Sequence, residues 1–239
     1  LIGGHHSGPL KLEVYKKNKK FIKSLELSKK AMSIYGSIIA HKKELYIFIN
    51  EFVNPEKDDD PYLIKVNTET LAVEKKDYHF SDYFRAIDGV ALHKSEKKIY
   101  IAPLAVQNFK KGENKSLFVF SFPEFDYLNK IDLGKQPDDV IYIPETDKLY
   151  INHGLSISVV ECQTEKVIKV LPYHAYRVED VGGGKVMLSH SEHVFDTDEV
   201  TGTMTTLYVD QKLVVIDTKT DTVLKEFVGE YGPISKFNR

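Results

Sequence analysis

Two segments of this 239-residue chain share a tyrosine-histidine pair followed by an aromatic residue and then an arginine. They read YHFSDYFRAID at 78–88 and YHAYRVED at 173–180. Arg85 and Arg177 are two of only three arginines, and every other basic residue is a lysine. A guanidinium offers a planar fork of donors that suits bidentate binding of carboxylate or phosphate, and it stacks on aromatic rings. The repeated context therefore indicates a binding site for an anionic or aromatic ligand.

The predicted ligand-binding residues come from both segments. They are Tyr78, His79, Tyr83, Phe84, Arg85, Tyr173, His174, Tyr176 and Arg177. In an alternative interpretation, each arginine pairs with a neighbouring carboxylate and fixes adjacent sheets to one another. The carboxylates that suit this role are Asp82, Asp88, Asp139, Glu179 and Asp180.

Histidines form the second group of residues that could do chemistry. The segment HSEHVFDTDEVTGTMTT at 190–206 reads as a long loop that offers His190 and His193 beside several carboxylates, and His153 is a third candidate. Imidazole with carboxylate suits zinc, copper or a similar divalent metal ion. The spacing matches neither a HExxH helix nor an EF-hand loop, so solvated side chains on a surface loop are the alternative. His93 falls in a short polar turn, where we expect exposure.

Composition excludes several classes of protein. A hydrophobic content of 42% is enough for a sizeable core, and the net charge of −2 leaves no basic face for nucleic acid. No apolar run approaches the roughly 18 residues of a membrane helix. The single cysteine, Cys162, excludes an internal disulfide framework and a CxxC metal site.

A repeated pair of hairpins must position these residues. In KLVVIDTKTDTVLKEFVG at 212–229, two short apolar strands flank a polar turn. The same pattern recurs at 156–172, 116–134, 62–78 and 10–27. Before four of these segments stands a second hairpin: SIIAHKKELYIFIN, GVALHKSEKKIYIAP, DVIYIPETDKLYIN and VEDVGGGKVMLSH. Each unit is therefore predicted to hold four strands, which we name a, b, c and d.

Four-stranded units at this period are typical of β-propeller blades. The segment PDDVIYIPETDKLYIN with ISVVECQTEKVIKVLP resembles the YVTN-type propeller repeat, and the resemblance covers nearly the whole chain. We therefore predict an all-β fold with one propeller domain over 1–239. Five blades are expected, the fifth closed by residues 1–28 together with about 231–237. The alternative is a part of a seven-bladed propeller.

Propeller geometry sorts the candidate residues. The b–c and d–a connections share one side of such a fold, which we call the top side. Both arginine segments fall in d–a connections, so we expect them to face each other across the mouth of the central channel. His153, His190 and His193 follow b strands on the same side. Tyr46, Tyr100 and Tyr150 recur on b strands and are expected to pack between sheets.

Three functions remain open. The first is a non-enzymatic recognition module that binds a small anionic or aromatic ligand, or a partner protein, on the top side. The second is a metal-dependent enzyme built from the top-side histidines, either a lactonase-like hydrolase or a copper redox enzyme. The third is a structural assembly subunit. YVTN-type propellers are commonly extracytoplasmic, so the resemblance implies a periplasmic or secreted location.

Overall fold

The computed structural model describes residues 10–15, 17–28, 38–50, 61–76, 78–84, 86–104, 115–197 and 204–229. The chain divides into two compact units, residues 1–114 with 118–129 and residues 115–117 with 130–239. The described residues are almost entirely β-structure, and their one helix is the single-turn 3-10 helix η1 (Phe80–Asp82). None of the described helical structure has the length and hydropathy that a membrane crossing needs.

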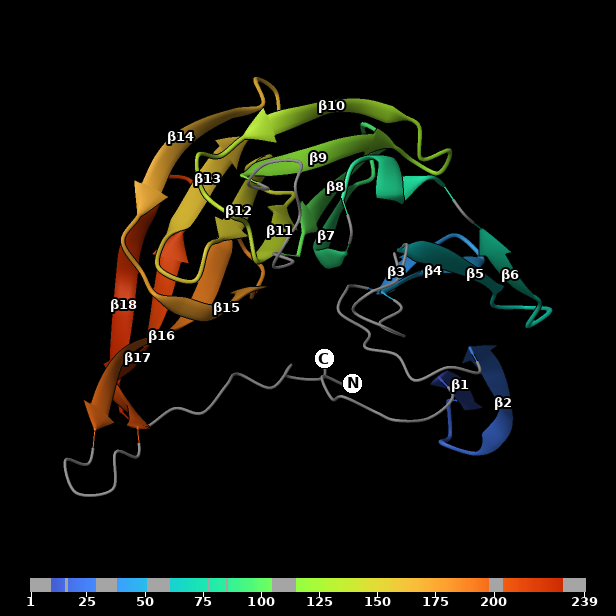
Figure 1. Ribbon diagram of the computed structural model, residues 1–239, viewed down its shortest axis with the longest axis horizontal. Coiled ribbons are helices and arrows are strands. Elements are labelled where there is room, and N and C mark those ends of the chain that lie inside the picture. The colour runs from blue at the N-terminus through green and yellow to red at the C-terminus, as the bar shows by residue number, and fades with distance from the viewer. Residues whose placement is uncertain are drawn as a thin grey trace. The chain divides into compact units, whose positions relative to one another are not determined.

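The first unit contains a two-stranded sheet, a four-stranded sheet and most of another (Figure 1). Its strands are β1 (Leu10–Tyr15), β2 (Phe21–Ser28), β3 (Ile38–His41), β4 (Glu44–Ile49), β5 (Tyr62–Asn67), β6 (Val73–Lys76), β7 (Ile87–His93), β8 (Lys98–Pro103), β9 (Ser116–Ser121) and β10 (Tyr127–Asp132). Neighbours follow the chain in each sheet: β1-β2, β3-β4-β5-β6 and β7-β8-β9-β10. The boundary between the units passes through β9 and β10.

The second unit contains two further four-stranded sheets, which lie side by side in Figure 1. The first consists of β11 (Asp139–Ile143), β12 (Lys148–Asn152), β13 (Ile157–Glu161) and β14 (Lys166–Leu171). The second consists of β15 (Ala175–Asp180), β16 (Lys185–Thr197), β17 (Met204–Asp217) and β18 (Thr222–Val228). Both are antiparallel and follow chain order. The predicted four-stranded units and both series of hairpins are therefore confirmed. Of the residues predicted to close the fifth blade, 1–28 and about 231–237, the segments 1–9 and 231–237 lie outside the described residues.

Tight turns close the hairpins with residues in the left-handed region. Among the described residues, eight such turns each contain one non-glycine residue at a φ between 52° and 63°. They are Lys19, Lys42, Leu71, Lys97, Phe125, Asp147, Glu165 and Asp221. The turn between β15 and β16 instead uses Gly182, Gly183 and Gly184, all at positive φ. Left-handed backbone costs a residue with a Cβ roughly 1–2 kcal/mol, so packing of the strands must hold these turns in place.

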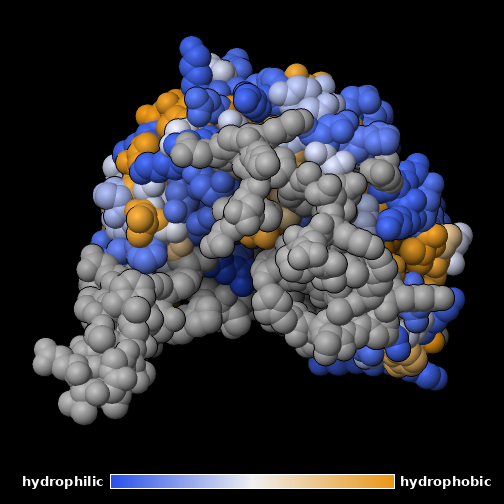
Figure 2. Space-filling model, in the orientation of Figure 1, coloured by the Kyte–Doolittle hydropathy of each residue, from blue (hydrophilic) through white to orange (hydrophobic). Residues whose placement is uncertain are grey.

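In each four-stranded sheet the fourth strand is the most exposed one. The second and third strands are largely buried, whereas β18 is exposed along its whole length. Figure 2 shows apolar residues among hydrophilic ones where β14 and β18 lie in Figure 1, and Ile168, Val170 and Leu224 are each about half exposed. Chemistry that needs a shielded environment therefore lies toward the first three strands.

Each unit has its own hydrophobic core. In the first unit the core is mostly aromatic, with Phe80 in contact with the rings of Phe48, Phe84 and Phe120. In the second unit it is aliphatic, with Val159, Leu188 and Val214 fully buried. A buried side chain of this size contributes about 1.5–3 kcal/mol relative to its exposed state. Tyr46, Tyr100 and Tyr150 are at most 2% exposed, which confirms the predicted packing role.

A buried polar network joins the two sheets of the second unit. Asp221, in the turn between β17 and β18, accepts hydrogen bonds from Nζ of Lys148 at 2.7 Å and from the hydroxyl of Tyr150. Its backbone carbonyl accepts a further bond from Nζ of Lys169 at 2.6 Å. Lys148 also donates to the carbonyl of Thr218 at 2.7 Å. Burial and the Asp221 carboxylate raise the pKa of Tyr150, so this phenol stays a donor.

Candidate functional site

The top side of the second unit is the best described candidate site. It is formed by the connections 133–138, 153–156 and 172–174, together with the point near His190 and Lys212 where β16 and β17 extend beyond their neighbours β15 and β18. These segments meet because antiparallel strands return the chain to the same end of a sheet after every second strand.

Asn152 holds three of these segments together. Its side chain is buried and Nδ2 donates to the carbonyl of Ala175 at 2.8 Å, while Oδ1 accepts from the backbone N–H of Gly154 at 3.0 Å. Its own carbonyl accepts from the backbone N–H of Asp138 at 2.8 Å. Each bond satisfies a backbone group at the start or end of a strand. Asn152 therefore fixes the geometry of the top side.

The first unit contains a counterpart of this arrangement. The buried side chain of Asn50, directly after β4, donates from Nδ2 to the carbonyl of Ile87 at 2.6 Å and accepts from its N–H at 2.8 Å. Ile87 and Ala175 each begin the first strand of the next sheet. Sequence reasoning missed both asparagines, although the endings YIFIN and LYIN were a signal.

His153, a predicted metal ligand, is bonded through both ring nitrogens. Nδ1 lies 2.7 Å from the carbonyl of Gln136, and Nε2 lies 2.8 Å from Oγ of Ser158. Because a carbonyl only accepts, Nδ1 carries the proton and Nε2 accepts from the serine. Burial lowers the pKa of the imidazole, which favours this neutral form. A metal ion at His153 would have to displace one of these bonds.

His190, Tyr173 and His174 do come together. His190 is 7% exposed, and its Nδ1 accepts a hydrogen bond from the backbone N–H of His174 at 3.1 Å. The half-buried Tyr173 ring meets the His190 ring edge-on at a centroid distance of 5.8 Å. Burial raises the pKa of Tyr173. The ring of His190 thus fixes the connection between β14 and β15.

Arg177 is engaged within its own strand. Its Nε forms an ion pair with Oε1 of Glu179 on β15, and the arginine side chain is 39% exposed. This partner is one of the carboxylates of the alternative interpretation, but it lies on the same strand and links no neighbouring sheet. The side chain of Tyr176 lies outside the description.

The first arginine segment lies in the other unit. Phe84 is fully buried and Tyr83 is half-buried, with its ring stacked on Tyr127 at 4.5 Å. Tyr78 is also half-buried against Phe125, and burial raises its pKa. His79 is exposed and left-handed, with a φ of 56°. These aromatic residues serve the core, and Arg85 itself lies outside the described residues.

Two predictions about the histidines were wrong: the loop at 190–206 and the exposure of His93. The segment predicted as a loop at 190–206 continues as paired strand: β16 runs to Thr197 and β17 begins at Met204, as Figure 1 shows. Pairing along this ribbon satisfies backbone groups that a loop would leave to water. The side chain of His193 within it is not described. His93, expected to be exposed, is 2% exposed, and its Nδ1 accepts from the backbone N–H of Glu96 at 3.3 Å.

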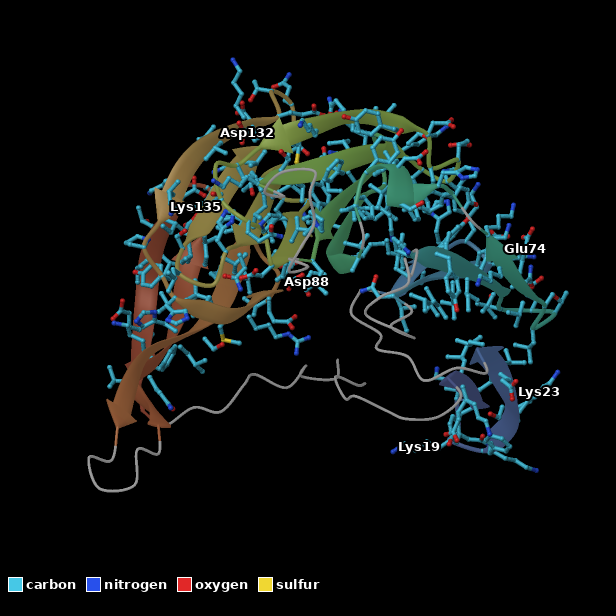
Figure 3. The ribbon with its side chains drawn as sticks, viewed as in Figure 1. Lys19, Lys23, Glu74, Asp88, Asp132 and Lys135 are labelled. Atoms are coloured by element: carbon cyan, nitrogen blue, oxygen red, sulfur yellow. The ribbon has the colours of Figure 1, made fainter. Side chains whose placement is uncertain are left out.

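Asp138 places a partly buried carboxyl group on the same top side. Within the described part of the chain, no hydrogen bond or ion pair involves its carboxyl group. Partial burial raises the pKa of that carboxyl. Nearby Lys135, labelled in Figure 3, donates from Nζ to Oγ of Ser156 at 3.0 Å. Sequence reasoning named the adjacent Asp139 and missed this residue.

Comparison with solved structures places these sheets among β-propellers. The WD40 domain of Pan2 from Neurospora crassa matches with a TM-score of 0.60 at 8% identity, over 93% of this chain and 63% of that one. The all-β fold of four-stranded propeller blades is therefore established, with five sheets in the described residues, one of them two-stranded.

Two further solved structures match at lower scores. The dihydro-heme d1 dehydrogenase NirN matches with a TM-score of 0.51 at 9% identity, over 91% of this chain and 53% of that one. The hydrazine synthase of Kuenenia stuttgartiensis matches with a TM-score of 0.50 at 14% identity, over 77% and 46%. The chain thus spans between 46% and 63% of these three structures. No protein-family model and no curated protein matches the sequence.

Proposed function

We propose that this protein is a non-enzymatic recognition module that binds its partner on the top side of its propeller blades. The observation that carries the proposal is the hydrogen-bonded framework around Asn152, which holds Asp138, Gly154 and Ala175 in fixed positions. A rigid set of loops loses little conformational entropy when it binds, which is the advantage of a preorganised surface.

The use of the histidines supports binding over metal catalysis. A catalytic metal site needs about three converging protein ligands and an open position. His153 instead uses both ring nitrogens to hold Gln136 and Ser158, and His190 uses Nδ1 to hold His174. These rings act as structural links between top-side connections.

Within this function, we assign an anionic group of the ligand or partner to the guanidinium of Arg177. Its side chain is 39% exposed, and the ion pair through Nε to Glu179 orients the group. The half-buried ring of Tyr173 lies in the connection directly before β15, the strand that carries Arg177. The role of Arg85, which lies outside the described residues, stays a prediction from the sequence.

Replacing Arg177 tests the proposal. Arg177→Lys keeps the charge but loses the planar fork, so the affinity for phenyl phosphate should fall about ten- to a hundredfold, as for one charge-assisted hydrogen bond. The melting temperature should stay unchanged. Lys166→Gln, which removes an exposed charge on β14, is the control and should bind as the parent does. Unchanged binding with a lower melting temperature would instead support the fixing role of the arginine.

The resemblance to YVTN-type repeats extends the proposal to an extracytoplasmic location. Fractionation of the source cells with an antibody against this chain tests it, and recovery with the cytoplasmic proteins contradicts it.

A further inference from the structure

We propose that the Asp138 carboxylate binds the ammonium group of a lysine side chain on a partner protein; this inference rests on the proposed recognition function and adds a cationic subsite to it. The carboxyl lies in the connection between β10 and β11, directly before the first strand of its sheet. The sequence motifs assign no role to it.

The charge of Asp138 is uncompensated. Its carboxyl group has no hydrogen-bond or ion-pair partner among the described residues, although it is partly buried. Lys135, three residues before it in the chain, donates from Nζ to Ser156 instead. Burying an ionised carboxylate without a partner costs free energy. A ligand cation would restore the missing partner, so the site favours an ammonium group over an anion.

Gly154 keeps the carboxylate accessible. A Cβ added to this glycine would lie 3.1 Å from Oδ2 of Asp138, closer than ordinary van der Waals contact. The glycine has a φ of +73°, and its N–H is held by Oδ1 of Asn152. The backbone next to the carboxylate is therefore both bare and fixed, as a binding site requires.

Leu155 provides the apolar half of the subsite. It follows Gly154 directly, at the tip of the turn between β12 and β13, and it is 75% exposed. A lysine side chain combines an apolar stem of four methylene groups with a compact terminal charge. Its stem would pack on Leu155 while its ammonium group reaches Asp138. An exposed apolar side chain beside a carboxylate therefore suits the stem and the charge of a lysine side chain.

A pair of peptides tests the proposal on the full chain. The probe is acetyl-Leu-Lys-Leu-amide, and its control is the same peptide with the lysine acetylated, which keeps the length and removes the charge. Binding is followed through the NMR signal of the Gly154 amide, because a Cβ at this residue would lie 3.1 Å from the carboxylate. We expect a saturable shift with the lysine peptide. The acetylated peptide should bind at least about tenfold more weakly.

Variants then assign the effect to one residue. Asp138→Asn should abolish the preference for the charged peptide while it folds at least as stably as the parent protein. Glu145→Gln, which removes an exposed carboxylate at the opposite end of the same sheet, should keep the preference. Equal affinity for both peptides, or an unchanged preference in Asp138→Asn, overturns the proposal. If Asp138→Asn fails to fold, the two peptides on the parent protein still decide, and the separate Arg177 experiment with phenyl phosphate shows whether the proposed function fails as well.

Discussion

The hydroxyl of Tyr150 donates a 2.5 Å hydrogen bond to Oδ1 of Asp221, from strand β12 of one sheet to the turn that closes β17 and β18 in the next. The other carboxylate oxygen of Asp221 binds Lys148 at 2.7 Å, and both charged side chains are at most 12% exposed. A buried pair of this kind is sensitive to the loss of either partner, because the remaining charge keeps its desolvation cost.

The first prediction removes that charge. Asp221→Asn keeps a side chain that tolerates the left-handed φ of 52° but leaves the Lys148 ammonium without its counter-ion. The free energy of unfolding should fall by about 3 kcal/mol, at the lower end for a broken buried pair. Urea unfolding followed by circular dichroism measures it. Glu69→Gln breaks the exposed pair with Lys43 and should cost less than about 1 kcal/mol, so equal losses would contradict the assignment.

The hairpin repeat could be read from the sequence because its signals are local. Each turn and its flanking strands occupy one short segment, such as 212–229, and apolar alternation with a polar turn gives the pairing directly. The limit of that reasoning is visible at β16 and β17. Their pairing continues as far as Thr197 and Met204, through a stretch that was predicted to be a loop because histidines and carboxylates interrupt its apolar residues.

The candidate site could not be predicted in the same way because its contacts are long-range. Asn152 bonds Ala175, 23 residues further along the chain, and Lys148 reaches Asp221 over 73 residues. No local pattern states which residues meet at that separation. The histidines show the same limit, since their positions were visible while the partners of His153, which decide its protonation, depend on the fold.

The second prediction concerns the two asparagines that link successive sheets. Asn152→Ala leaves the carbonyl of Ala175 and the N–H of Gly154 without their partner, and Asn50→Ala does the same to both backbone groups of Ile87. Each unsatisfied buried group costs about 1–3 kcal/mol. Both variants should therefore lose at least about 2 kcal/mol in chemical denaturation. Asn18→Ala, at an exposed turn, is the control, and a comparable loss there would remove the special role of the buried pair.

The third prediction separates backbone strain from steric contact at the top side. Gly154→Ala introduces a Cβ 3.1 Å from Oδ2 of Asp138, whereas Gly134→Ala, at a similar φ of +66°, meets nothing within 4 Å. Both variants pay the strain of left-handed backbone, roughly 1–2 kcal/mol. Only Gly154→Ala should also displace the Asp138 carboxylate. We expect the larger fall in melting temperature for Gly154→Ala, and equal falls would mean that the carboxylate moves without cost.

The fourth prediction is a dependence of stability on pH that arises from His153. Burial lowers the pKa of its imidazole below the usual 6.5, so between that lowered value and 6.5 the unfolded chain binds more protons than the folded one. The free energy of unfolding should therefore decrease as the pH falls through this window. Above the window, the contribution of the neutral His153 to stability is complete. The side chain of His153→Gln stays neutral, so the free energy of unfolding of this variant, measured with urea, should decrease less between pH 7.5 and pH 5.5.

Ser158→Ala provides the matched control for that measurement. It removes the hydroxyl that donates to Nε2 but keeps the imidazole and its bond from Nδ1 to Gln136. Its stability should be lower at both pH values, by about 0.5–1.5 kcal/mol for one hydrogen bond, because the buried nitrogen loses a partner. Its decrease toward pH 5.5 should persist, since the ring that resists protonation is still present. A decrease of the same size in the parent protein and in His153→Gln would show that other groups cause it, and that the neutral ring of His153 is not what holds Gln136 and Ser158 together on the top side.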